Sequence, residues 1–250
     1  ETASRFSRTL TATTVTWSSN ALTITLELGE PDVDALKLHS MLAKDLGTTF
    51  LRLVGTVGAI DDMAGNTLEL NSTRNGAMAA SAYTLDTTSP ALASFDLSVP
   101  ELCCDQLVAA NYYSAEQCAT LFGDEYPSSP SGANLTLRFD EPVDANSFDG
   151  AGVTLQAGET LVATTSLTLS SATTASPNGR DIVVTLAPSE RATLASITSL
   201  GRLTSNTYVT LTSYTVRDLS VLHRNALSAI ADGAAQQVGP VLRRFELDLD

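Results

Sequence analysis

DTTSPALASFDLSV, residues 86–99, returns near the other end of the chain as VGPVLRRFELDLD, residues 238–250. The first copy contains Pro90, Leu92, Phe95 and Leu97, which match Pro240, Leu242, Phe245 and Leu247 of the second. Three pairs of segments that precede the two copies also match. ALTITLEL (21–28) matches DIVVTLAP (181–188), and TTFLRLVG (48–55) matches NTYVTLTS (206–213). AIDDMAGN (59–66) matches TVRDLSVLHRN (215–225). Matches in a constant order indicate an internal repeat.

The repeat predicts three parts along the chain, because each unit begins at a strand that follows a proline. Residues 1–88 are expected to form the C-terminal portion of a first module, and residues 89–238 a complete module. Residues 239–250 are expected to form the first strand of a following module. Repeated units of this kind are building blocks that pack on their neighbours.

The first module is expected to contain a hairpin and a short helix. Residues 7–17 and 21–28 alternate threonine with apolar residues, which is typical of two β-strands. Residues 30–47 begin with acidic residues around Pro31, which favours a helix that ends at Gly47 after Lys44. Its expected buried stripe is Val33, Leu36, Leu38, Met41 and Leu42. After it, Leu51 and Leu53 are expected to face inward, and Gly65-Asn66 to form a turn with positive φ.

The complete module repeats this order with more strands. Residues 134–144 (NLTLRFDEPVD) predict a strand with Leu135, Leu137 and Phe139 inward, and residues 152–156, 160–171 and 181–187 predict further strands. The equivalent helix is expected over 188–203, with Pro188, Glu190, Leu194, Ile197 and Gly201 in the corresponding roles. Many short strands with one short crossover helix per unit predict an all-β fold of tandem antiparallel β-sandwiches.

Residues 100–133 interrupt the complete module and contain all three cysteines, Cys103, Cys104 and Cys118. We expect a small helical insertion between two strands, closed by a disulfide from Cys103 or Cys104 to Cys118. The odd cysteine then stays free or pairs with another chain. Three reduced thiols in an intracellular protein are the alternative.

Composition excludes several classes of partner. A net charge of -14 and a pI near 4.4 disfavour nucleic acid and anionic membrane surfaces, both of which attract clustered lysine and arginine. No apolar run approaches the roughly 20 residues that a membrane helix needs. The low charged share of 17% points to a surface of uncharged serine and threonine, which is compatible with a secreted protein.

FDEPVDANSFDGAGVTLQ, AIDDMAGNTL and DTTSPALASF resemble the opening strands, a late turn and the linker of Ig-like repeats in cell-surface proteins, first described in bacterial S-layer proteins. The resemblance covers nearly the whole chain outside 100–133. TVRDLSVLHRN departs from the pattern, since a longer turn replaces the Gly-Asn turn. The resemblance implies rods in surface layers, adhesins, stalks and extracellular fibres, and similar arrays occur in eukaryotic surface proteins, including those of flagellate algae.

No set of residues predicts a reaction, so we do not expect an enzyme or a cofactor. His39 and His223 occupy non-equivalent places in different modules, which disfavours a catalytic triad. The acidic residues Asp61, Asp62, Glu141 and Asp144 lie in expected turns or strand ends. Calcium at a junction between modules, bound by Asp86, Asp96, Asp61 and Asp62, is the alternative that carboxylate chemistry allows.

Two sequons, at Asn71 and Asn134, are candidate sites for N-linked glycans. Asn71 follows a turn, and Asn134 opens a strand. We therefore expect glycans on the protein if its source is eukaryotic.

The apolar residues of 239–250 have no sheet of their own, and they are Val241, Leu242, Phe245, Leu247 and Leu249. The first module in turn has no counterpart of residues 89–99 or 134–144. Either the sequence is a slice of a longer array, or 239–250 of one subunit completes the open module of the next, as in strand donation. We expect a structural building block of an extracellular filament or surface layer whose partners are copies of itself. The alternative is an adhesive stalk module of a cell-surface receptor.

Overall fold

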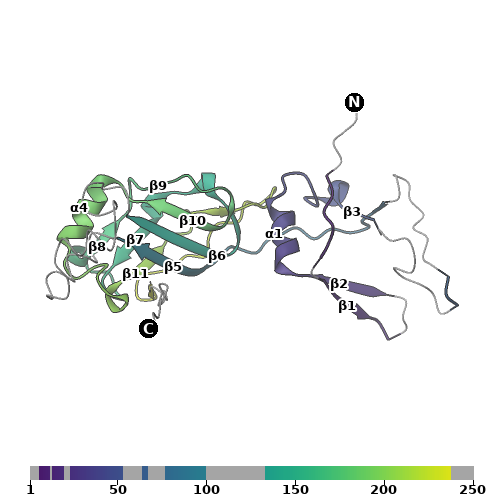
Figure 1. Ribbon diagram of the computed structural model, residues 1–250, viewed down its shortest axis with the longest axis horizontal. Helices are drawn as coiled ribbons and strands as arrows, with labels where there is room; N and C mark the ends of the chain where they lie inside the picture. Colours follow the sequence, from purple (N-terminus) through teal and green to yellow (C-terminus); the bar gives the residue numbers. More distant parts are fainter. Residues whose placement is uncertain are drawn as a thin grey trace, which may run out of the picture. The chain divides into compact units, whose positions relative to one another are not determined.

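A computed structural model describes residues 6–11, 13–19, 23–52, 64–66, 77–99 and 133–237 of the chain (Figure 1). The chain divides into two compact units. The first unit comprises Glu1–Thr87 with Ser220–His223, and the second comprises Thr88–Leu219 with Arg224–Asp250. Antiparallel strands dominate, and the described residues contain two α-helices, α1 and α4. The expectation of a mostly β fold is therefore confirmed.

The second unit contains a sheet of five antiparallel strands in the order β12-β6-β10-β9, with β5 pairing with β6. Its strands are β5 (Leu92–Ser98), β6 (Asn134–Asp144), β9 (Thr173–Thr174), β10 (Gly179–Thr185) and β12 (Arg217–Asp218). Ser98 pairs with Asn134 at the end of the β5–β6 ladder. The expected insertion at 100–133 therefore leaves and re-enters the sheet at adjacent positions, although its residues 100–132 and their cysteines lie outside the described residues.

A second sheet of the same unit has the strand order β13-β11-β7-β8. Its strands are β7 (Val153–Gln156), β8 (Ser166–Thr168), β11 (Tyr208–Leu211) and β13 (Gln236–Gln237). Residues 160–171 were expected to form one longer strand. Only β8 is extended there, because the single-turn helix Ala163–Thr165 precedes it.

Side chains of both sheets form one buried cluster. In β6, Leu135 and Leu137 are fully buried and Phe139 is 1% exposed, which confirms the predicted inward face. Val209 and Leu211 of β11 are buried in the same alternating pattern. The period of two in the sequence thus reports which face of each strand meets the core.

The helix α4 (Pro188–Ser196) begins at the predicted proline but ends earlier than predicted. Glu190 is buried and accepts hydrogen bonds from the Ala187 and Ser171 amides at 2.8 and 2.7 Å. Ile197 caps the helix, and Gly201, at φ 72°, lies beyond it. Residues 197–199 are Ile-Thr-Ser. Isoleucine and threonine lose side-chain rotamer freedom in a helix, and serine competes for backbone hydrogen bonds, so this stretch disfavours a longer helix.

The first unit begins with the predicted hairpin of β1 (Thr13–Trp17) and β2 (Ile24–Leu28). Helix α1 (Glu30–Leu38), a helical turn at Leu46–Thr48 and β3 (Phe50–Leu51) follow, and β3 pairs with β4 (Met78–Ala79). Gly65 has φ 85°, as the expected turn requires, whereas Asn66 does not have positive φ.

The predicted length of α1 is wrong. The helix ends at Leu38, since the Nδ1 atom of His39 accepts the Met41 and Leu42 amides at 3.1 Å and turns the chain. Leu38 and Met41 of the expected buried stripe are 43% and 60% exposed. The buried residue of α1 is Asp32.

Candidate assembly surface on the first unit

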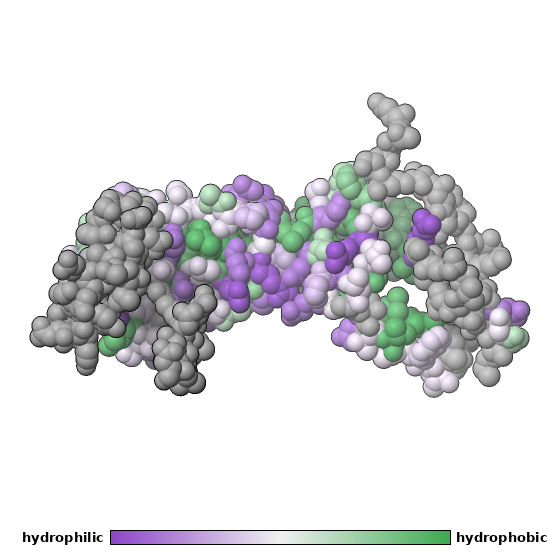
Figure 2. Space-filling view, in the orientation of Figure 1, coloured by the Kyte–Doolittle hydropathy of each residue, from purple (hydrophilic) through white to green (hydrophobic). Residues whose placement is uncertain are grey.

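The β1–β2 hairpin has one apolar and one polar face. Val15 lies opposite Leu26 and Trp17 opposite Ile24, while Thr16 lies opposite Thr25 on the other face. Val15, Trp17 and Leu26 are 47%, 58% and 40% exposed. Figure 2 shows hydrophobic residues at the surface where Figure 1 places this hairpin. A strand pair with an apolar face normally packs that face on a second layer.

The two units share a structural repeat from Gly29 to Leu51 and from Ala187 to Val209. Equivalent residues differ in number by 158, as for the helix N3 residues Asp32 and Glu190 (190 − 32). The same spacing separates TTFLRLVG from NTYVTLTS in the sequence. The sequence match of 21–28 with 181–188 is two residues out of this register, since residues 23–28 correspond to 181–186.

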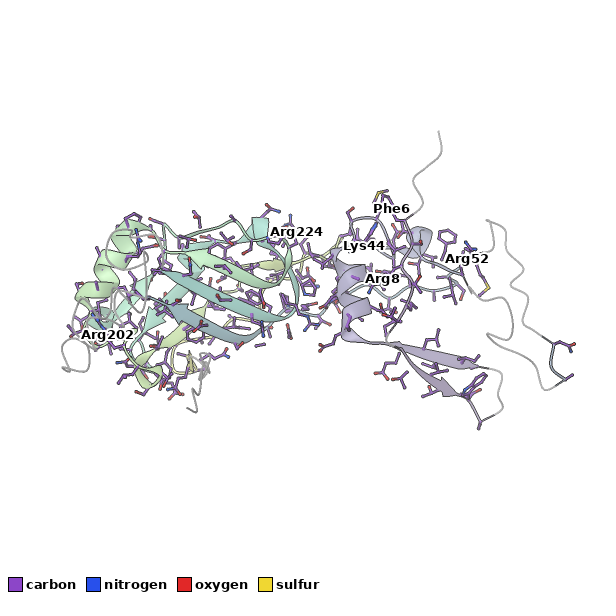
Figure 3. All side chains as sticks on the ribbon, in the orientation of Figure 1. Phe6, Arg8, Lys44, Arg52, Arg202 and Arg224 are labelled. Atoms are coloured by element: carbon purple, nitrogen blue, oxygen red, sulfur yellow. The ribbon has the colours of Figure 1, made fainter. Side chains whose placement is uncertain are left out.

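Hydrogen bonds after the helices establish the equivalence. Lys44 Nζ donates to the Lys37 carbonyl at 2.7 Å, and Arg202, at the equivalent position, donates to the Ala195 carbonyl at 3.1 Å (Figure 3). These carbonyls belong to the last helical turn, where a cation is favourable. The cation expected at the helix C-terminus is thus present, although it comes from the loop.

The following loop repeats the same pattern. Thr48 Oγ1 accepts the Lys44 and Asp45 amides, and Asn206 Oδ1 accepts the Arg202 and Leu203 amides. Thr49 and Thr207 then donate their hydroxyls to the carbonyls of Asp45 and Leu203 at 2.6 and 2.7 Å. Different side chains thus produce one backbone shape in both units.

Burial differs between the equivalent strands. Leu26 corresponds to Val184, and Leu51 corresponds to Val209; both residues of the first unit are 40% exposed, whereas both of the second unit are fully buried. The expectation that Leu51 faces a core is therefore wrong for the described residues. Val209 faces a core because side chains of the five-stranded sheet pack against those of its strand, β11.

The difference has a topological origin. β10 lies between β9 and β6, whereas β2, its counterpart, pairs with β1 and with no other strand among the described residues. Within the described ranges, no strand pairs with the far edge of β2, and a further strand would satisfy the backbone donors and acceptors there. The apolar face and this edge of β2 together form what we call the open face of the first unit.

Buried charge stabilises the helix side of the first unit. Asp32 is fully buried and accepts hydrogen bonds from the guanidinium of Arg8 at 3.0 Å and from the Thr11 amide at 2.6 Å (Figure 3). In the second unit Glu190 accepts the Ser171 amide in the corresponding place, ahead of β9. This role was not predicted from the sequence, although an acidic residue follows Pro31 directly and Pro188 after one residue.

Three described side chains have perturbed pKa values: Tyr83, Asp181 and Arg138, whose pKa is raised by its hydrogen bond to Asp181. Burial raises the pKa of Tyr83, and the carboxylates of Asp86 and Asp45 raise it further. The hydrogen bond from Arg138 lowers the pKa of Asp181, and the two side chains form an exposed ion pair at 2.8 Å between adjacent strands.

The structure places some of the predicted site residues and leaves others outside the described ranges. Asn134 opens β6 and accepts a hydrogen bond from the Thr185 hydroxyl at 3.2 Å. Asn71, Asp61, Asp62, Cys103, Cys104, Cys118 and residues 241–249 lie outside the described residues.

For the calcium alternative, Asp86 forms an ion pair with Lys37 at 2.8 Å, and Asp96 lies within β5 of the other unit. No group of three or more metal-ligating side chains occurs within the described ranges. His39 caps α1, and His223 lies in a turn. Glu141, expected to be solvated, is instead only 8% exposed in β6.

Comparisons with protein-family models, with curated proteins and with solved structures find no match to the chain. In the part of the chain that the structure describes, no helix has the length and apolar character needed to cross a membrane.

Proposed function

We propose that the protein is a structural building block of an extracellular, glycosylated filament or surface layer. Its units are tandem Ig-like β-sandwiches that assemble head to tail, and residues 239–250 supply a strand to a neighbouring module. The resemblance of the sequence to Ig-like surface repeats and the shared hydrogen bonds of the two units support tandem modules.

The observation that carries the proposal is the open face of the first unit. Leu26 is 40% exposed where Val184, its counterpart, is fully buried. Burying a leucine side chain contributes roughly 1.5–3 kcal/mol, so a face of several such residues favours a covering partner. In the second unit, the equivalent strand β10 pairs with the antiparallel strand β6, and a second sheet packs on its apolar face.

Residues 239–250 are the proposed cover because they present Phe245, Leu247 and Leu249 at alternate positions. They resemble β5 in sequence, which pairs with β6 in the second unit, and on β2 they would take the place of β6. One strand face would then be apolar and the other charged, as a half-buried strand requires. The same contact repeated from chain to chain is heterologous, and a heterologous contact that does not close forms a filament.

Deletion of 239–250 tests the proposal. We expect the full chain to sediment as oligomers and to form ordered filaments in electron micrographs, and the shortened chain to remain monomeric. Unchanged assembly after the deletion would exclude strand donation. A full chain that stays monomeric, with 239–250 protected from hydrogen exchange, would show that the segment folds onto its own first unit.

Two serine substitutions test whether assembly depends on the open face or on exposed apolar side chains in general. Leu26→Ser removes an apolar side chain from the open face, and Leu161→Ser removes one that is 46% exposed elsewhere, in the second unit. We expect the first to weaken assembly and the second to leave it unchanged. Equal effects of both would contradict a role for the open face.

A further inference from the structure

The strand pairing of the second unit defines how a strand would lie on β2. β6 runs antiparallel to β10, with Leu137 opposite Ile182 and Leu135 opposite Val184. By the 158-residue spacing, Ile24 and Leu26 of β2 take the places of Ile182 and Val184. An antiparallel strand on β2 therefore needs apolar residues opposite Ile24 and Leu26.

The outer face of the same ladder has charged positions. In the second unit, Arg138 lies opposite Asp181 and bonds to it at 2.8 and 2.9 Å. On β2 the acidic residue of the outer face is Glu27, which is exposed and lies next to Leu26. Opposite charges directly across two strands stabilise their pairing, and like charges destabilise it.

Two registers of 239–250 satisfy the apolar requirement. In the first, Phe245 lies opposite Leu26 and Leu247 opposite Ile24, so that Arg244 lies opposite Glu27. In the second, shifted by two residues, Leu247 lies opposite Leu26 and Leu249 opposite Ile24.

This shifted register places Glu246 opposite Glu27, and two carboxylates then face each other. A shift by one residue turns the apolar side chains to the wrong face. The pairing of charges therefore favours the first register, whereas at Leu28 the shifted register places Phe245 and the first places Arg243.

We propose that residues 239–250 of a second copy of this chain pair antiparallel with β2 in the register that sets Arg244 opposite Glu27. The inference rests on the proposed function and adds the residue pair that selects the register. Phe245 then fills the space beside Leu26, and Arg244, Glu246 and Asp248 lie on the outer face, while Arg243 lies opposite Leu28 at the end of β2.

Charge reversal in the full chain tests the pair. Glu27→Arg or Arg244→Glu alone places like charges across the strands, and we expect the concentration needed for assembly to rise on the order of fivefold. The double variant restores opposite charges and should assemble as the unchanged chain does. Glu159→Arg, an exposed residue of the second unit, makes the same change in charge and should have no effect.

Paired cysteines report the register directly. With Thr25→Cys on β2, Glu246→Cys should form the intermolecular disulfide, because these positions lie opposite each other in the proposed register. Asp248→Cys should not, since it lies opposite Thr25 only in the shifted one. Peptide mapping by mass spectrometry distinguishes the new disulfide from any bond of the native cysteines.

The possible results distinguish a wrong register from a wrong proposal of strand donation. If deletion of 239–250 abolishes assembly while single charge reversals do nothing, or if Asp248→Cys forms the disulfide, the register is wrong and strand donation stands. If the deletion leaves assembly unchanged, strand donation itself is wrong. Failure of the double variant to recover assembly would also overturn the pairing of Arg244 with Glu27.

Discussion

Ala43 and Gly201 occupy the same position of the two units and share a left-handed backbone, with φ of 52° and 72°. The amide of each donates to a carbonyl at an equivalent place, Thr48 in the first unit and Asn206 in the second. A left-handed conformation suits glycine and strains alanine. The first unit therefore contains a strained residue that the second unit avoids.

Exchange of these residues should have opposite effects. We expect Ala43→Gly to stabilise the first unit slightly or leave it unchanged, since relief of strain offsets the greater entropy of an unfolded glycine. Gly201→Ala should destabilise the second unit by about 1 kcal/mol. Urea unfolding followed by hydrogen exchange of each unit measures both, and a stabilising Gly201→Ala would contradict the argument.

The buried carboxylates at the two helix starts should matter for stability. Glu190→Ala removes the acceptor of the Ser171 and Ala187 amides, which we expect to cost about 1–3 kcal/mol. Glu190→Gln keeps one acceptor oxygen and should cost less. Unfolding curves of the two variants test the order, and equal losses would show that the hydrogen bonds contribute little.

The raised pKa of Tyr83 predicts that the folded chain loses stability at high pH. Its pKa in the folded chain is raised above the ordinary value of 10.0, so the stability that neutral Tyr83 contributes is complete below that value. It is lost as the pH rises through the raised pKa. A pH series of unfolding curves, with phenolate absorbance as the direct readout, should show this fall in the natural chain and a smaller one in Tyr83→Phe.

Gly150 should not accept a side chain. A Cβ atom there would lie 2.2 Å from the Leu169 carbonyl oxygen, too close for any real contact, so the backbone would have to move. We expect Gly150→Ala to destabilise the second unit by roughly 1–3 kcal/mol.

Gly158→Ala is the matched control, because the nearest atom to its Cβ would be 4.0 Å away. Thermal unfolding of the two variants gives the comparison. Equal melting temperatures would indicate that the chain near Leu169 moves without cost.

The sequence predicted those features that depend on neighbouring residues along the chain. Leu135, Leu137 and Phe139 alternate with polar residues, and their buried face follows directly from that period. Helix starts were also predictable from proline and acidic residues. The helix end at Leu38 was not, because it depends on a side-chain bond from His39 to two amides.

Features that depend on a covering layer were harder to predict. Leu51 has the same pattern as Val209, but a pattern reports which face is apolar and not whether a second layer is present. The burial of Asp32 requires Arg8 and Thr11, which are distant in sequence and have no motif that connects them. The open face was expected from the missing strands, and its residues became definite only with the paired register of β1 and β2.

Because Ser98 pairs with Asn134, a foreign domain can be inserted between β5 and β6. Paired residues of antiparallel strands lie about 4.5–5.5 Å apart, so a guest domain whose own ends are close together can replace residues 100–132 without parting the ladder. An enzyme or an epitope inserted there would be displayed once per copy of the chain.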